Sequence, residues 1–217
     1  MKKLVILGAG GLARELANSV ADINKQTPTF EVLGYLDDEK RLIGQKRLQL
    51  PVLGTVDWLA EHKSNNLWAI AAVGDGYLRE KFTCLIEQNN VPLATIIHPS
   101  AIIGFGNSIE AGLFIAAGCV ITVDVSLAQC ALVNMSCTIG HDVSVGKYAS
   151  IQPGARISGE VTIGDYALVG TQAVILNKCT IGRGAVVAMG AVVAGDVPDY
   201  TLVAGNPARA VKKLDKR

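Results

Sequence analysis

A repeat with a period of six residues runs through the second half of the chain. Every sixth residue from Ile97 to Val193 is isoleucine, leucine or valine. Small residues recur four positions after these aliphatic residues, and glycine often follows them directly. The small residues are Ala101, Cys119, Ala131, Cys137, Ala149, Ala155, Ala167, Ala173, Cys179, Ala185 and Ala191, and the glycines are Gly104, Gly140, Gly146, Gly164, Gly170 and Gly182. Such a repeat determines the architecture of the whole segment.

A period of six predicts short, flat strands, because six is a multiple of the two-residue repeat of a strand and not of the 3.6-residue repeat of a helix. We therefore expect a three-sided coil, a parallel β-helix, in which each hexapeptide forms one face. The aliphatic residue points inward, the small residue packs beside it, and the glycines ease the corners. Residues three hexapeptides apart then stack on one another. No long insertion interrupts the repeat, so a pocket must use the faces of the prism and a neighbouring subunit.

Residues 1–96 have a different pattern, in which expected strands alternate with expected helices. The strands are at residues 4–7, 30–36 and 67–73, and the helices are at residues 12–23, 55–62 and 77–89. This alternation predicts a small parallel sheet of about three or four strands with ligands at the carboxyl ends of its strands. We thus expect a mainly β chain, with a small Rossmann-like α/β domain at 1–96 followed by a β-helix at 97–217. Residues 91–99 form the join.

Charge and composition exclude several classes of partner. The net charge is +1, from 20 basic and 19 acidic residues, so no global field favours nucleic acid or an anionic membrane. We see no apolar run of about 18 residues and no cleavage-type segment, which favours a cytoplasmic protein. The cysteines form no C-x-x-C pair and are expected to be reduced thiols.

A glycine-rich turn is the first candidate site. Residues 8–13 have the pattern G-x-G-x-x-A between a strand and a helix, where backbone N–H groups can bind phosphate. Because the small sheet is only half of a dinucleotide fold, a nucleotide sugar fits better than NAD. Asp37 and Asp38, after the second strand, can accept hydrogen bonds from a nucleoside. The alternative is that the glycines make a tight turn and the aspartates cap a loop.

His141 is the candidate catalytic residue. It follows the inward Ile139 by two positions, so it is expected at a corner with its side chain facing outward. The adjacent Asp142 carboxylate favours the protonated form and so raises the basicity of the imidazole, and a raised basicity is what a general base near neutral pH requires. His62 and His98 fall outside the coil, on a helix end and at the join. The coil therefore lacks the ligands for zinc, and its inward cysteines are expected to be inert.

The repeat, the Gly140-His141-Asp142 corner and residues 203–209 resemble the hexapeptide-repeat acyltransferases. Residues 8–11, 35–38 and 72–75 narrow the resemblance to one branch of that family. It contains the bacterial UDP-4-amino-sugar N-acetyltransferases of bacillosamine-type glycan synthesis and the sialic acid O-acetyltransferases. The resemblance implies that the β-helix is left-handed and that the protein is a homotrimer. It also implies that acetyl-CoA is the co-substrate and that the reaction uses no metal.

The resemblance also implies roles for individual residues. His141 is then the catalytic base, supported by Asp142. The residues expected to contact the nucleotide sugar are Gly10, Gly11, Leu12, Asp37, Asp38 and Gly74, and those expected to contact acetyl-CoA, in a groove between two prisms, are Ser150, Gly159 and Thr171. Leu12 departs from the polar residue, commonly histidine, that relatives carry there. The expected reaction is acetylation of the 4-amino group of a UDP-linked amino-deoxy sugar. O-acetylation of sialic acid, a non-catalytic trimeric scaffold and an NAD-dependent enzyme remain alternatives.

Overall fold

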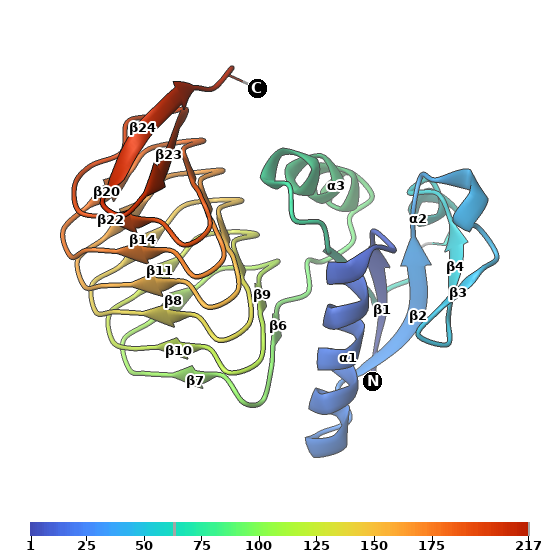
Figure 1. Cartoon of the computed structure of the whole chain (residues 1–217). Coiled ribbons are helices and arrows are strands. Elements are labelled where there is room, and N and C mark those ends of the chain that lie inside the picture. The colour runs from blue at the N-terminus through green and yellow to red at the C-terminus, as the bar shows by residue number, and fades with distance from the viewer. Residues whose placement is uncertain (63, 217) are drawn as a thin grey trace. The chain divides into compact units, whose positions relative to one another are not determined.

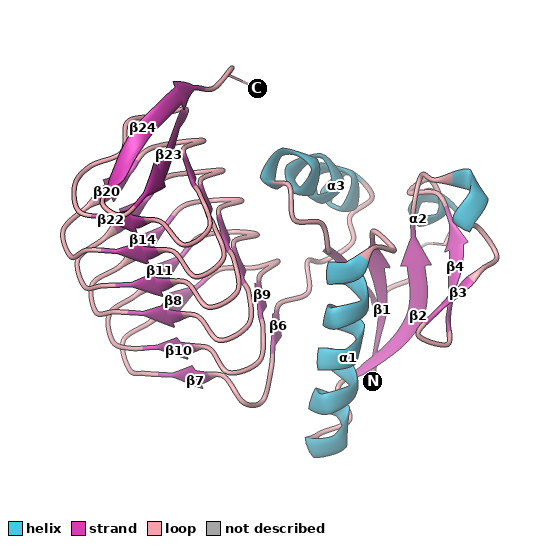
Figure 2. Ribbon diagram, viewed as in Figure 1, coloured by secondary structure: helices cyan, strands magenta, loops and turns pink. Residues whose placement is uncertain are grey.

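The chain changes architecture near Pro99. The structure, a computed structural model, describes residues 1–62 and 64–216. One unit comprises Met1–Pro99 and the other begins at Ser100, so the division falls just after β6 (Ile96–Ile97). Figure 1 traces both units along the chain, and Figure 2 shows that the helices belong to the first unit and short strands to the second.

The first unit is a Rossmann-like sheet with helices. Its elements are β1 (Lys2–Leu7), α1 (Gly11–Gln26), β2 (Phe30–Leu36), η1 (Lys40–Leu42), β3 (Lys46–Arg47), β4 (Leu50–Gly54), α2 (Trp58–Glu61), β5 (Leu67–Ala71), α3 (Gly76–Gln88) and β6. The strand order among the described residues is β3-β4-β2-β1-β5. The strands β1, β2, β4 and β5 are parallel, and β3 is antiparallel to β4.

The central strand β1 is buried on both faces, as expected for a parallel sheet. Leu4, Val5, Ile6 and Leu7 of β1 are all fully buried, although successive side chains point to opposite faces. Val5 and Leu7 pack in one cluster with Phe82 and Ile86 of α3. In a parallel sheet of this kind, a ligand is expected at the carboxyl ends of the strands.

The sequence predicted β1, β2, β5 and the three α-helices, but it missed β3 and β4. The strand β4 contains Pro51 and ends in Gly54, two residues that disfavour a strand from local propensity alone. Its pairing with β2 is a long-range contact that the local pattern does not reveal. The predicted third strand also ends earlier than expected, at Ala71.

The second unit is the expected left-handed parallel β-helix, a prism with three faces. Face I contains β7 (Ile102–Ile103), β10 (Val120–Ile121), β13 (Thr138–Ile139), β16 (Arg156–Ile157), β19 (Val174–Ile175) and β22 (Val192–Val193). Face II contains β8 (Ser108–Ile109), β11 (Ser126–Leu127), β14 (Ser144–Val145), β17 (Thr162–Ile163) and β20 (Thr180–Ile181). Face III contains β9 (Phe114–Ile115), β12 (Leu132–Val133), β15 (Ser150–Ile151), β18 (Leu168–Val169), β21 (Val186–Val187) and the terminal hairpin of β23 (Thr201–Gly205) and β24 (Ala208–Lys213).

The prism core is the aliphatic column that the repeat predicted. Every sixth residue from Ile115 to Val193 is buried, and the small residues from Cys119 to Ala191 are buried beside them. Ile103 and Ile109, in the first coil, are only half-buried. The inward cysteines Cys119, Cys137 and Cys179 are buried as expected.

The glycines that follow the aliphatic residues do not make the corners, which corrects the sequence-based expectation. The left-handed conformation occurs two positions later, at every sixth residue from Gly106 to Gly190, and includes non-glycine residues such as Asp142 (φ 57°). Glycines such as Gly140 and Gly164 are needed for a different reason: the backbone of the next coil passes too close to leave space for a side chain. A Cβ at Gly164 would lie 2.6 Å from the backbone nitrogen of Arg183, and one at Gly140 would lie 2.7 Å from that of Gly159.

Candidate active site

His141 and Asp142 lie together at the corner between face I and face II. The His141 Nδ1 atom is 2.8 Å from the Asp142 Oδ2 atom, and the two side chains are 57% and 58% exposed. Because an ionised carboxylate only accepts hydrogen bonds, this contact assigns the proton to Nδ1 and leaves a lone pair on Nε2. Among the described residues, Nε2 has no hydrogen-bond partner. The corner therefore carries a partly exposed imidazole whose Nε2 atom makes no hydrogen bond to the described residues.

Gly159 occupies the corresponding corner of the next coil, directly beside the His141 ring. The backbone N–H of Glu160 donates to the His141 carbonyl at 2.8 Å, which stacks the two corners. A Cβ at Gly159 would lie 2.5 Å from both Cε1 and Nε2 of His141. The Gly159 N–H has no acceptor within the described part of the chain. Gly159 is thus the predicted acetyl-CoA contact that the fold brings to His141.

The other two predicted acetyl-CoA contacts lie elsewhere on the prism. Ser150 is on face III, in β15, and is 2% exposed. Thr171 is exposed at the corner between face III and face I, where it lines an apolar hollow with Leu168, Val186 and Met189. Within one prism, face I separates Thr171 from the His141 corner.

The glycine turn lies at the carboxyl end of β1. Gly8 has a positive φ of 103°. Its Cα lies close to the segment that follows β5, and a Cβ on Gly8 would lie 3.0 Å from the Val73 side chain. Gly10 and Gly11 are exposed, and a Cβ at either would meet nothing within 4 Å. The turn is therefore open to a ligand at the start of α1.

The two predicted aspartates share this edge of the sheet. Asp37 Oδ2 accepts a hydrogen bond from the Ala9 N–H at 2.8 Å, and Asp38 Oδ1 accepts one from the Val56 N–H at 3.2 Å. Asp37 thus helps to shape the glycine turn. The structure brings Gly10, Gly11 and Asp37 together.

The remaining predicted substrate contacts lie around the same strands. Leu12 is half-buried in the first turn of α1, and Gly74 is exposed just after β5. The non-polar Leu12 side chain offers no hydrogen bond at this position, as its departure from the relatives predicted.

Two residues near this edge were missed by the sequence interpretation. The exposed Arg14 donates from Nε to the Gly10 carbonyl at 3.3 Å, which sets a cation beside the turn. Its position four residues after Gly10, at the start of a helix, was the available signal. Tyr35 is fully buried, its hydroxyl lacks a partner among the residues described, and burial raises the pKa of Tyr35.

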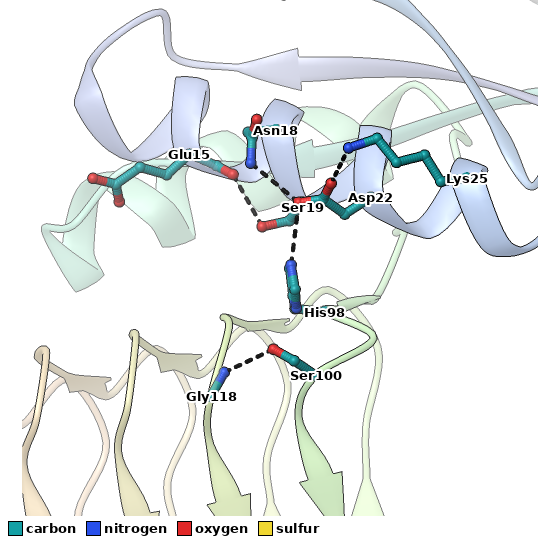
Figure 3. Close-up of polar contacts among 8 residues, drawn as sticks. All are labelled: Glu15, Asn18, Ser19, Asp22, Lys25, His98, Ser100 and Gly118. Carbon is teal, nitrogen blue, oxygen red and sulfur yellow. Dashed lines mark hydrogen bonds and ion pairs between the residues drawn. The ribbon is translucent and has the colours of Figure 1, made fainter.

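The other histidines are engaged within the first unit. Figure 3 shows His98 Nε2 pointing at Asp22 Oδ2, 3.3 Å away, with Lys25 bound to the same carboxylate at 2.6 Å. The hydrogen bond from Lys25, followed by that from His98, lowers the pKa of Asp22. His62 stacks on Trp58 with the ring centroids 4.0 Å apart. Of the three histidines, His141 is the one at a prism corner.

Residues 1–62 and 64–216 contain no cluster of three or more His, Cys, Asp or Glu side chains that could hold a metal ion. In the same residues, none of the helices is long and apolar enough to cross a membrane.

Two family models match the chain. The PglD N-terminal domain matches residues 3–85, and the bacterial transferase hexapeptide (six repeats) matches residues 160–195. Their positions correspond to the α/β unit and to the prism. Among curated proteins, no match was found.

Several solved structures match the chain over nearly its whole length, and three of them are compared with it as follows. The acetyltransferase domain of PglB from Neisseria gonorrhoeae FA1090 is 31% identical, with 97% of this chain and 100% of that chain covered and a TM-score of 0.90. PerB from Caulobacter crescentus, in complex with CoA and GDP-perosamine, is 27% identical with 98% of each chain covered and a TM-score of 0.90. WeeI from Acinetobacter baumannii AYE is 27% identical, with 97% and 100% covered and a TM-score of 0.87.

Proposed function

The chain belongs to the hexapeptide-repeat sugar N-acetyltransferases, the family of the acetyltransferase domain of PglB, and on this premise we propose that it acetylates the 4-amino group of a UDP-linked amino-deoxy sugar. Acetyl-CoA is the acetyl donor, as the PglB domain in complex with acetyl coenzyme A supports. The observation that carries the proposal is the exposed His141–Asp142 pair, 2.8 Å apart at a prism corner. A non-catalytic scaffold would have no need of a basic nitrogen held in this way.

His141 acts as the general base in a direct transfer. Asp142 accepts the Nδ1–H, so Nε2 is available to take a proton. The sugar nitrogen attacks the thioester carbonyl carbon, the C–N bond forms and the C–S bond breaks. The proton moves from the nitrogen to Nε2 and then to the sulfur of CoA. The products are the N-acetyl sugar and CoA as a free thiol, and a base of this kind contributes about 10²- to 10⁴-fold to the rate.

The Gly159 N–H is our proposed donor to the oxyanion that forms during the attack. The Cα of Gly159 adjoins the His141 ring, and its N–H has no acceptor among the described residues. A backbone N–H aimed at developing negative charge stabilises the transition state without having to reorganise.

A homotrimer is the proposed assembly. The large hydrophobic residues that the prism exposes on and beside face I are Ile102, Phe105, Val123, Met135, Val174, Leu176 and Met189. The outward positions of face II are instead the exposed Ser108, Ser126, Ser144, Thr162 and Thr180. Face I also carries the exposed Arg156, but a largely apolar surface of this kind favours burial against another subunit.

The proposed trimer is consistent with the separation of the predicted acetyl-CoA contacts. Gly159 and Thr171 lie on different corners of one prism, on either side of face I. A groove between two prisms allows Gly159 of one subunit and Thr171 of its neighbour to contact the same acetyl-CoA molecule. Ser150 and Gly159 are both buried in the single chain, but Gly159 adjoins the exposed His141 ring, whereas a contribution from Ser150 on face III is indirect.

The nucleotide sugar is proposed to bind at the glycine turn. Backbone N–H groups at the start of α1 and the exposed Arg14 suit a diphosphate. Asp37 already accepts hydrogen bonds from the Ala9 and Glu39 N–H groups, but each carboxylate oxygen has a second lone pair that can accept from a nucleoside. The PerB complex favours a GDP-linked amino sugar as the second candidate.

The deciding experiment is a substrate screen with acetyl-CoA that measures release of free thiol. A UDP-linked 4-amino sugar, its GDP-linked counterpart and sialic acid are compared at equal concentration, with His141→Ala as the inactive control. We expect thiol release with the UDP-linked amino sugar. Turnover of the GDP-linked sugar alone would change the assigned nucleotide, and turnover of sialic acid alone would replace N-acetylation by O-acetylation.

A further inference from the structure

Gly159 differs from Gly140 and Gly164 in the atoms that an added Cβ would meet. At Gly140 and Gly164 an added Cβ would meet the backbone of the next coil. At Gly159 the nearest atoms all belong to the His141 ring: Cε1 and Nε2 at 2.5 Å and Cδ2 at 3.0 Å. Gly159 does not have a positive φ, so its backbone conformation does not require glycine. The reason for glycine at this position is the space occupied by the imidazole.

The His141 ring has few other restraints. Its side chain is 57% exposed, and its side-chain hydrogen bond is the one from Nδ1 to Asp142. That bond fixes one ring nitrogen but leaves the ring free to tilt about it. The flat surface of Gly159 supports the edge that carries Nε2 and Cε1. The direction of the Nε2 lone pair is therefore set jointly by the hydrogen bond to Asp142 and by packing of the ring against the Cα of Gly159.

The size of the disturbance from a methyl group follows from ordinary contact distances. Carbon atoms in van der Waals contact lie about 3.5–4.0 Å apart, so a Cβ at 2.5 Å requires the ring to move by roughly 1 Å or more. The ring is the exposed end of a side chain and can move without disturbing the prism. A displacement of about 1 Å in a reacting group is enough to reduce a rate by about 10²-fold.

We propose that Gly159 is a positioning residue, whose missing side chain holds the His141 ring at the angle needed for proton transfer. This inference rests on the proposed function of His141 as the base. It is distinct from the expected contact between Gly159 and acetyl-CoA, because the effect acts through the imidazole.

A double-mutant cycle on turnover tests this role. Gly159→Ala is expected to lower kcat by about 10²-fold with little change in KM for either substrate. In the His141→Ala background the same change is expected to have little further effect, because the ring through which it acts is gone. Gly195→Ala is the matched control: Gly195 lies at the same corner two coils further on, and its added Cβ would meet nothing within 4 Å. An equal loss of kcat from Gly159→Ala in both backgrounds would overturn the proposal and point to the acetyl-CoA contact.

A second measurement does not depend on activity. The ring ¹H–¹⁵N signals of His141, assigned by their loss in His141→Ala, are compared between the wild type, Gly159→Ala and Gly195→Ala. We expect them to shift in Gly159→Ala alone, with an unchanged Tm. Unshifted signals would overturn the positioning role. If His141→Ala alone keeps full turnover, the proposed function fails instead, and the ring signals still decide whether Gly159 positions the imidazole.

Discussion

Replacement of His141 by alanine separates catalysis from folding. The His141 side chain is 57% exposed and its hydrogen bond is to Asp142, which is equally exposed, so its loss leaves no buried group unpaired. A surface change of this kind alters the free energy of unfolding by about 0.5 kcal/mol or less. Loss of a general base lowers turnover by about 10²- to 10⁴-fold, which corresponds to a barrier about 3–5 kcal/mol higher.

The assay follows from that contrast. Initial rates of thiol release give kcat and KM, titration calorimetry gives the affinity for each substrate, and thermal unfolding gives Tm. We expect the kcat of His141→Ala to fall while both substrates still bind, because a general base contributes to rate and not to binding.

Asp142→Asn is the graded comparison. Asparagine tolerates the left-handed backbone found at Asp142 (φ 57°), and its amide oxygen can accept the same hydrogen bond. The base remains, so we expect a smaller loss of kcat than in His141→Ala. A well-folded His141→Ala protein with near-normal turnover would refute the assignment of the base, and parallel loss of Tm and substrate affinity would indicate a structural role.

Further predictions concern the nucleotide site, the prism and the assembly. Gly10→Val should weaken nucleotide-sugar binding in titration calorimetry and leave acetyl-CoA binding intact, because the valine side chain has room in the fold but crowds the phosphate. Binding of NAD by the wild type without a response to UDP sugars would contradict the assignment of a nucleotide-sugar site. Gly164→Ala should destabilise the prism by about 1–3 kcal/mol, since its Cβ would lie 2.6 Å from the Arg183 nitrogen, and a Tm as high as that of Gly195→Ala would contradict this. Light scattering at micromolar concentration should give a trimer of the 22.8 kDa chain, and a monomeric mass would exclude it.

The prism core could be predicted from sequence because every coil repeats the same environment. Ile121, Ile139 and Ile157 face inward for the same local reason, and each is almost fully buried. The missed strand β4 shows the limit of this approach. Its Pro51 and Gly54 form a strand because β2 lies beside them, and that neighbour is distant in sequence.

The corners illustrate the same limit. Glycine is permissive for a positive φ, so the sequence interpretation assigned the turns to residues such as Gly140. The left-handed residue is instead Asp142, while Gly140 is needed for the passage of the next coil. Backbone angles at a corner depend on how two coils stack, which local composition does not encode.

By itself, the sequence determined that His141 lies at an outward corner beside a carboxylate, and that residues three hexapeptides apart stack. Only the tertiary structure decided that the imidazole packs against the Cα of Gly159, and that face I lies between Thr171 and the His141 corner. The physical reason is that the ring orientation depends on a side-chain torsion, a hydrogen bond at 2.8 Å and the space left by the neighbouring coil. These are set jointly by residues that meet only after the chain has folded.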